Sequence, residues 1–153
     1  MIIYIMNQNF SRVRSANDII ISCSLMVAGA ALMLLPYGVG LNMAGFFLLA
    51  IGLLFIFVYK SAYKLEGTTE LYRRKELYFK HEELEKIKKA LLSKTPQLDI
   101  SEEGKGKSLK LDIFYSRKSG KGFVKLYEYV PHTYEPLTDS KEFSIGQIEQ
   151  LIK

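Results

Sequence analysis

The chain has 153 residues and a formal net charge of +5, and its 48% hydrophobic and 24% charged residues are averages that suit one ordinary domain. The two kinds of residue are segregated, because the 41 residues from Ile19 to Tyr59 include no Asp, Glu, Lys, Arg or His, whereas 19 Lys or Arg and 15 Asp or Glu follow Tyr59. This composition excludes collagen, coiled-coil, disulfide-scaffold and wholly disordered proteins, and the single cysteine, Cys23, excludes a cysteine-based zinc site.

The uncharged run predicts a transmembrane hairpin. A bilayer core about 30 Å thick needs roughly 20 helical residues, so the run is about twice as long as one crossing. Pro36, Gly38 and Gly40 lie in its middle and favour a turn. We therefore expect a leader over residues 1–17 and a two-helix hairpin over residues 18–60, with Asp18 as the first N-cap and helices at about 18–35 and 41–59.

The charges that flank the run predict its orientation. Arg12 and Arg14 precede the first helix, and the turn between the helices is uncharged. Five basic residues follow the second helix: Lys60, Lys64, Arg73, Arg74 and Lys75. Because basic flanks stay on the cytoplasmic side of a membrane, we expect a multi-pass inner-membrane protein with both termini in the cytoplasm.

Small residues predict the faces through which the helices pack. On the first helix Ser24, Ala28 and Ala31 share one face, and on the second helix Gly45 and Gly52 share one face. Such faces allow backbones to approach closely in lipid. They would serve either the contact within the hairpin or an interface with a second copy or a partner protein.

Residues 61–153 predict a small cytoplasmic α+β domain. Alternating apolar and β-branched residues indicate strands, and helical spacing of apolar residues indicates helices. We expect Lys60–Lys64 to extend the second membrane helix, with Gly67 as its C-cap. The remaining expected elements are a strand in at least the second half of Leu71–Phe79, strands at Leu109–Tyr115 and Phe123–Val130, an interrupted edge strand at Thr133–Phe143, a helix at Glu82–Ser93, and a C-terminal helix that starts with a Ser144–Gln147 capping box.

No motif of this chain indicates an enzyme or a cofactor. His81 and His132 have no partners at the spacing of a metal or catalytic site. Gly106, Lys107 and Ser108 match only the tail of a phosphate-binding P-loop, and a strand follows them where that motif needs a helix.

Two basic loops supply the candidate anion-binding residues. Glycines beside these cations expose backbone N–H groups that bind anions, and nearby tyrosines could stack on a base. If the two loops met at one end of the sheet, they could hold an anionic lipid headgroup, a nucleotide or RNA. Otherwise their glycines and basic residues only keep the loops soluble. The basic residues are Lys105, Lys107, Arg117, Lys118 and Lys121, and the tyrosines are Tyr115, Tyr127, Tyr129 and Tyr134.

The layout of two spans followed by a small strand-rich domain resembles in outline the membrane-anchored effectors of bacterial anti-phage signalling systems, a likeness of architecture alone. The first expected function is that of a non-enzymatic membrane-anchored interaction or regulatory protein. Its partners would be the lipid bilayer and either a second copy or another protein. The alternative is a ligand-sensing effector whose cytosolic domain binds a nucleotide and whose helices oligomerise to perturb the membrane.

Overall fold

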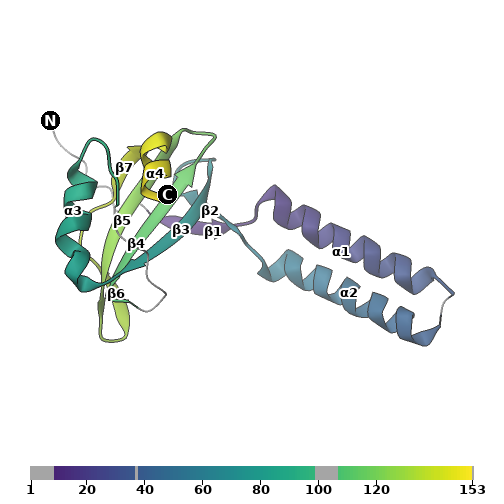
Figure 1. Ribbon diagram of the computed structural model, residues 1–153. Helices are drawn as coiled ribbons and strands as arrows, with labels where there is room; N and C mark the ends of the chain where they lie inside the picture. The colour runs from purple at the N-terminus through teal and green to yellow at the C-terminus, as the bar shows by residue number, and fades with distance from the viewer. Residues whose placement is uncertain (1–8, 37, 99–106, 153) are drawn as a thin grey trace. The chain divides into compact units, whose positions relative to one another are not determined.

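The computed structural model describes residues 9–36, 38–98 and 107–152. The chain divides into two compact units, each with its own internal contacts (Figure 1). One unit holds Ser11–Tyr63, and the other holds Phe10 together with the chain from Lys64 onward. The α+β unit therefore takes up chain on both sides of the hairpin, whereas the sequence led us to expect it only after residue 60.

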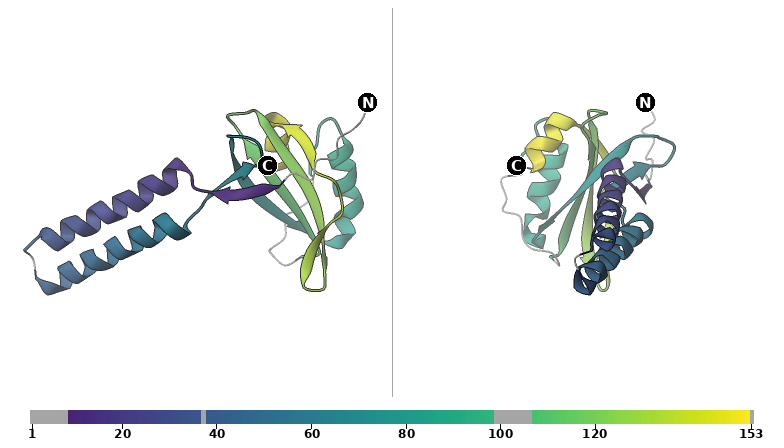
Figure 2. Two further views of the ribbon diagram at one scale, coloured as in Figure 1. Left: turned by 180° about the vertical axis from the view of Figure 1, so that it is seen from behind. Right: turned by 90° about the vertical axis from the view of Figure 1, so that its right-hand side faces the viewer.

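The first unit is a hairpin of two apolar helices, α1 (Ala16–Leu34) and α2 (Val39–Val58), which lie side by side (Figures 1 and 2). The predicted layout of two adjacent apolar helices is confirmed, with helix bounds shifted by one or two residues. Gly38 in the turn adopts a φ of 108°, a backbone conformation that favours glycine.

Ser15, and not Asp18, is the N-cap of α1. The Ser15 hydroxyl oxygen accepts from the Asp18 N–H at 3.2 Å, and the Ser15 N–H donates to Asp18 Oδ2 at 2.9 Å. An aspartate at the third helical position thus completes a reciprocal capping box. Because of this box, the helix begins before Ile19, the first residue of the uncharged run.

The expectation that Lys60–Lys64 extends the second helix is wrong. α2 ends at Val58, and a short strand, β2 (Ala62–Leu65), follows it. Gly67 consequently lies in the turn after β2, at a φ of 83°, and caps no helix. A second short strand, β1 (Phe10–Val13), lies in the segment that the sequence indicated was only a leader.

The α+β unit confirms the predicted strands and helices, with antiparallel pairing throughout β3–β7. Within the described residues, one sheet has the strand order β1-β2-β3-β4-β5-β6, and β7 pairs with β5 beside β6. The interrupted edge strand is thus two strands. The elements are β3 (Leu71–Phe79), η1 (His81–Glu83), α3 (Leu84–Leu92), β4 (Leu109–Ser116), β5 (Lys121–Val130), β6 (Thr133–Pro136), β7 (Lys141–Ser144) and α4 (Ile145–Ile152).

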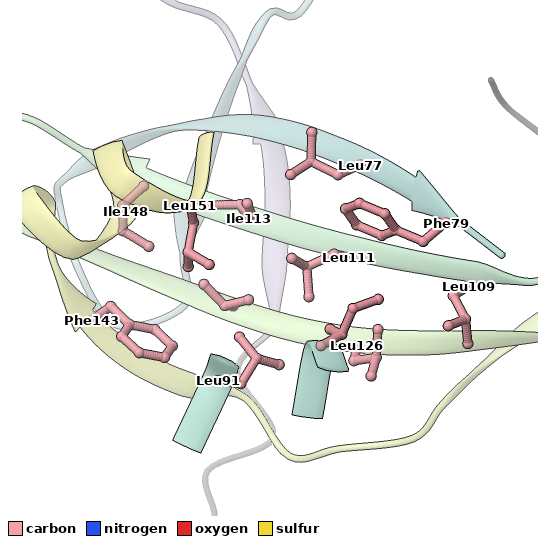
Figure 3. Close-up of a cluster of buried hydrophobic side chains, with 12 residues drawn as sticks. Leu77, Phe79, Leu91, Leu109, Leu111, Ile113, Leu126, Phe143, Ile148 and Leu151 are labelled. Atoms are coloured by element: carbon pink, nitrogen blue, oxygen red, sulfur yellow. The ribbon is translucent and has the colours of Figure 1, made fainter. Parts of the chain in front are cut away.

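The hydrophobic core lies between the sheet and the two helices α3 and α4, which cover the same face (Figures 2 and 3). Alternate residues of a strand point to opposite faces, so Leu77, Leu111 and Leu126, which are cross-strand neighbours, all point toward the helices. The complete buried cluster is Leu77, Phe79, Ile87, Leu91, Leu109, Leu111, Ile113, Val124, Leu126, Phe143, Ile148 and Leu151.

Helix α4 begins with the predicted capping box. The Ser144 N–H donates to Gln147 Oε1 at 2.9 Å, and the Gln147 N–H donates to the Ser144 hydroxyl at 3.5 Å. The helix then buries Ile148 against Gly122 of β5, where an added Cβ would lie 2.8 Å from Ile148 Cγ1. A helix this short is marginal alone, so this packing holds it in place.

Candidate functional site

Three glycines bring the backbones of α1 and α2 into direct contact. A Cβ built on Gly29 would lie 2.6 Å from both the Gly45 carbonyl oxygen and the Leu49 nitrogen. A Cβ on Gly52 would lie 2.9 Å from the Ser22 carbonyl oxygen. The hairpin therefore closes through small residues spaced by seven on each helix, Ser22 and Gly29 on one and Gly45 and Gly52 on the other.

The candidate helix-packing residues divide between two surfaces. Gly45 and Gly52 are buried in the contact with α1, while Ser24, Ala28 and Ala31 are exposed. Sequence reasoning missed Ser22 and Gly29, although a signal existed: they repeat the seven-residue spacing of the two glycines on α2.

The outer surface of the hairpin is apolar. α1 and α2 are 19 and 20 residues long and apolar enough to span a membrane. Large side chains along both helices are exposed, and Leu34 and Val39 beside the turn reach 85% and 76%. The further exposed apolar residues include Ile20, Val27, Met43, Phe46, Phe47, Leu54, Phe57 and Val58.

A buried carboxylate closes the open end of the hairpin. Asp18 on α1 is 3% exposed. Its Oδ1 accepts from the Ser61 hydroxyl at 2.5 Å, and its Oδ2 accepts from the Ser61 N–H at 2.9 Å. The Ser15 and Ser61 hydroxyl oxygens are 3.1 Å apart. Because Ser61 follows α2, these bonds join the two points at which the chain enters and leaves the hairpin.

The structure places Lys107 apart from the basic residues of the second loop. Lys107 precedes β4, whereas Arg117, Lys118 and Lys121 follow it, and Lys105 lies outside the described residues. The 8 residues of β4, at about 3.3 Å each, place Lys107 about 26 Å along the strand from Arg117. Among the described candidates, Lys107 therefore does not share one end of the sheet with the other three.

Two of the candidate cations are paired with acids. Lys121 Nζ lies 2.9 Å from Glu142 Oε1, and this hydrogen bond raises the pKa of Lys121. Arg117 Nε lies 3.5 Å from Glu149 Oε1, with both side chains largely exposed. At the other end of β4, the Lys107 carbonyl accepts from the Tyr134 hydroxyl at 2.8 Å.

A basic depression lies where β3 begins and β4 ends. Its volume is about 200 Å³. Arg73, which sequence reasoning counted only as a basic flank of the hairpin, joins Arg117 and Lys118 in lining it. The six residues that line the basic depression are Leu71, Arg73, Tyr115, Ser116, Arg117 and Lys118.

The face of the sheet opposite α3 and α4 carries charged and aromatic side chains. Arg74 donates to Asp112 through Nε at 2.9 Å and through Nη2 at 2.7 Å, and its Nη2 also lies 2.6 Å from Glu76 Oε1. The Tyr78 hydroxyl donates to Glu76 Oε2 at 2.9 Å. These charged and tyrosine side chains thus form hydrogen bonds and ion pairs mainly with one another.

Lysine and tyrosine side chains continue this face toward β6. Lys110 Nζ lies 4.7 Å from the ring centroid of Tyr127 and 4.8 Å from that of Tyr134. Tyr129 packs edge-on against Tyr134. Burial raises the pKa of Tyr127 and of Tyr134. Tyr115 lies on the other face, with the hydrophobic core, so the four tyrosines do not form a single stacking platform.

The two histidines occupy separate, exposed positions. His81 Nδ1 lies 3.0 Å from Glu128 Oε1, and His132 lies in the turn between β5 and β6 with a φ of 75°. Over residues 9–36, 38–98 and 107–152, no group of three or more His, Cys, Asp or Glu side chains is arranged to hold a metal ion.

A mostly apolar groove of about 230 Å³ separates α3 from β5 and β7. Leu91, Leu92 and Val124 line its apolar part. Its rim is polar, because Lys88, Thr138, Asp139 and Lys141 surround the opening. Lys141 donates to the Leu91 carbonyl at the end of α3, so one rim cation is used to cap a helix.

The chain matches no protein-family model, no curated protein and no solved structure.

Proposed function

We propose that this protein is a non-enzymatic membrane-anchored interaction or regulatory protein, whose α1–α2 hairpin crosses the inner membrane and holds the α+β unit on the cytoplasmic side. The observation that carries the proposal is the exposed apolar surface all along the hairpin. Soluble proteins rarely expose an apolar patch of this extent, whereas a lipid environment matches it. At 1.5 Å per residue the helices are about 28 and 30 Å long, close to the bilayer core.

The two helices also fit a membrane-spanning role better than two alternatives, a core helix of a soluble protein and a cleaved signal sequence. A core helix of a soluble protein is buried, but only 17% and 11% of the most apolar windows of α1 and α2 are buried. A cleaved signal sequence would use one helix near the N-terminus, and α2 would still remain to be covered.

Polar groups at the open end of the hairpin support the proposed orientation. Arg12 and Arg14 precede α1, and Lys60 and Lys64 follow α2, while the turn carries no charge. Arg12 lies over the ring of Tyr63, 5.9 Å from its centroid. Basic and aromatic residues at this end suit the cytoplasmic interface of a bilayer.

The non-enzymatic part of the proposal rests on how polar groups are used. Asp112, 3% exposed, is held by two hydrogen bonds from Arg74. Asp18 is occupied by Ser15 and Ser61. These buried carboxylates stabilise the fold, and their partners leave them unavailable as acids or bases in a reaction. The proposed role of the α+β unit is therefore to bind a partner through its exposed surfaces.

Cysteine labelling tests the orientation in the full-length chain. With Cys23→Ser as the background, single cysteines replace Asn9, Val39 or Asp139, all of which are exposed. A membrane-impermeant maleimide applied to intact spheroplasts should label only the cysteine at position 39. Permeabilised spheroplasts, in which all three should react, provide the control.

Labelling at position 9 or 139 in intact spheroplasts would contradict the proposed orientation. Release of the protein from membranes by alkaline carbonate would contradict the anchor itself, because a spanning hairpin resists that extraction.

A further inference from the structure

The basic depression is created by the pairing of β3 with β4. Arg73 is the cross-strand partner of Tyr115. Residues two positions apart on a strand share a face, so Leu71 lies on the same face as Arg73. Arg117 comes directly after the end of β4, in the turn toward β5, and lines the same depression. The two arginines thus reach the same hollow from β3 and from the β4–β5 turn.

The charges around the depression are positive and largely uncompensated. Arg73, Arg117 and Lys118 line it, and among the described residues no Asp or Glu does. Among the residues that the structure describes, Arg73 and Lys118 form no ion pair. Arg117 has Glu149 at 3.5 Å, but both side chains are more than half exposed, and such surface pairs contribute little. An anion in the depression can therefore compete for Arg117.

We propose that the basic depression binds a phosphate monoester group, carried either by a lipid headgroup or by a small soluble ligand. Two guanidinium groups offer paired N–H donors that match the geometry of phosphate oxygens. Lys118 adds a third cation, and together they suit a group with close to two negative charges.

The size of the depression limits the ligand. Its volume of about 200 Å³ is below the roughly 300–1,000 Å³ of pockets that enclose drug-sized molecules. A phosphate with a glycerol attached suits this space, whereas a complete nucleotide would leave its base outside. The proposal does not depend on the anchor, because a soluble phosphate monoester requires no membrane.

The distribution of cations elsewhere supports a specific role for these three. On α3, Lys86 lies 2.9 Å from Glu83 Oε2 and Lys88 lies 4.0 Å from Glu85 Oε1, one helical turn apart in each pair. Each of those lysines is paired with an acid on its own helical surface, and only Lys88 lines a hollow, the mostly apolar groove beside α3. The cations of the basic depression converge instead, at a cost in mutual repulsion that an anion removes.

Binding measurements on the full-length chain in a non-ionic detergent test the proposal in two arms. In the soluble arm, calorimetry measures binding of glycerol 3-phosphate, with glycerol as the uncharged comparison. In the lipid arm, native mass spectrometry compares retention of phosphatidic acid, a monoester, with retention of phosphatidylglycerol, a diester. The test variant combines Arg73→Gln, Arg117→Gln and Lys118→Gln. The matched control, Lys86→Gln, Lys89→Gln and Lys94→Gln, removes the same charge from exposed positions.

Each hydrogen bond to a charged group is worth roughly a tenfold change in affinity or more. In at least one arm, the affinity of the test variant for the monoester should therefore fall at least tenfold, while the control variant keeps the affinity of the original protein. Loss confined to the soluble arm identifies a soluble ligand, and loss confined to the lipid arm identifies a headgroup. The proposal is overturned if the original protein binds no monoester in either arm, or if the test and control variants behave alike. Circular dichroism of both variants verifies that they remain folded.

Discussion

Tyr78 is the buried tyrosine whose surroundings are most specific. It is 8% exposed, its hydroxyl donates to Glu76, and Glu76 in turn contacts the arginine that holds Asp112. Burial, followed by the hydrogen bond to the Glu76 carboxylate, raises the pKa of Tyr78 to about 12. Ionising this hydroxyl would place a second negative charge beside Glu76 in a poorly hydrated position, which explains the direction of the shift.

The fold should lose stability in alkaline solution because of Tyr78. The unfolded chain releases this proton near the ordinary pKa of 10.0 and the folded chain only near 12. The contribution is therefore fully present below about pH 10 and is lost as the pH rises toward about 12, by up to roughly 2–3 kcal/mol. Absorbance titration of the folded chain should show a late tyrosine step that Tyr78→Phe removes.

Tyr129→Phe is the matched control for this titration, because Tyr129 on β5 is 49% exposed. It should leave the late step in place. A step near pH 12 that keeps its full amplitude in Tyr78→Phe would contradict the assignment to Tyr78.

At the scale of elements, the close contact of α1 and α2 depends on the absence of side chains at particular points. Gly45→Ala would place a Cβ 2.6 Å from the Gly29 carbonyl oxygen, so the helices must separate. Overpacking of this kind costs about 1–3 kcal/mol. Gly40→Ala, also on α2, meets nothing within 4 Å and should leave the hairpin unchanged.

Spin labels report this separation directly. With Cys23→Ser as the background, cysteines at the exposed positions Ala31 and Phe47 carry the labels. The distance between the labels in detergent or lipid should increase in Gly45→Ala and stay the same in Gly40→Ala. An unchanged distance in both variants would show that the backbones are not in contact at Gly45.

The elements that could be predicted from the sequence are those whose pattern is local. β3, β4 and β5 have 9, 8 and 10 residues, long enough for alternation to show, and α3 and α4 carry amphipathic spacing. β1 and β2 have 4 residues each and exist through pairing between segments on either side of the hairpin. No periodicity within either segment signals such a partner.

The candidate site was predictable in part for the same reason. The strand expected at Leu109–Tyr115 separates Lys107 from Arg117 along the chain, so the length of that strand already implied that these two residues lie at opposite ends of it. Arg117 and Lys118 were among the candidates, but Arg73 was not. Only the β3–β4 register, with Arg73 opposite Tyr115, brings the third cation to them, and a register between strands separated by 29 residues leaves no mark in the sequence.

At the scale of the whole molecule, the hairpin is an insertion in the chain of the α+β unit. Phe10, which precedes the hairpin, belongs to that unit. Its ring stacks on Phe114 at a centroid distance of 4.0 Å and an interplanar angle of 3°, and it contacts Tyr72 and Phe123. The segment before α1 therefore completes an aromatic cluster on the helix-free face of the sheet.

A shortened chain that begins at Ala62 should consequently be less stable than one in which residues 9–15 are joined to Ser61 by a short Gly-Ser linker. Such a linker suffices because the Ser15 and Ser61 hydroxyls are 3.1 Å apart. Full burial of a phenylalanine contributes about 1.5–3 kcal/mol, so the half-buried Phe10 contributes less than that, and a favourable ring pair adds about 0.5–1.5 kcal/mol. Urea unfolding followed by circular dichroism measures the difference, and Phe10→Ala in the linked chain should abolish most of it. Equal stability of the two shortened chains would mean that the unit folds from the residues after the hairpin alone, and that Phe10 only rests on a cluster already complete without it.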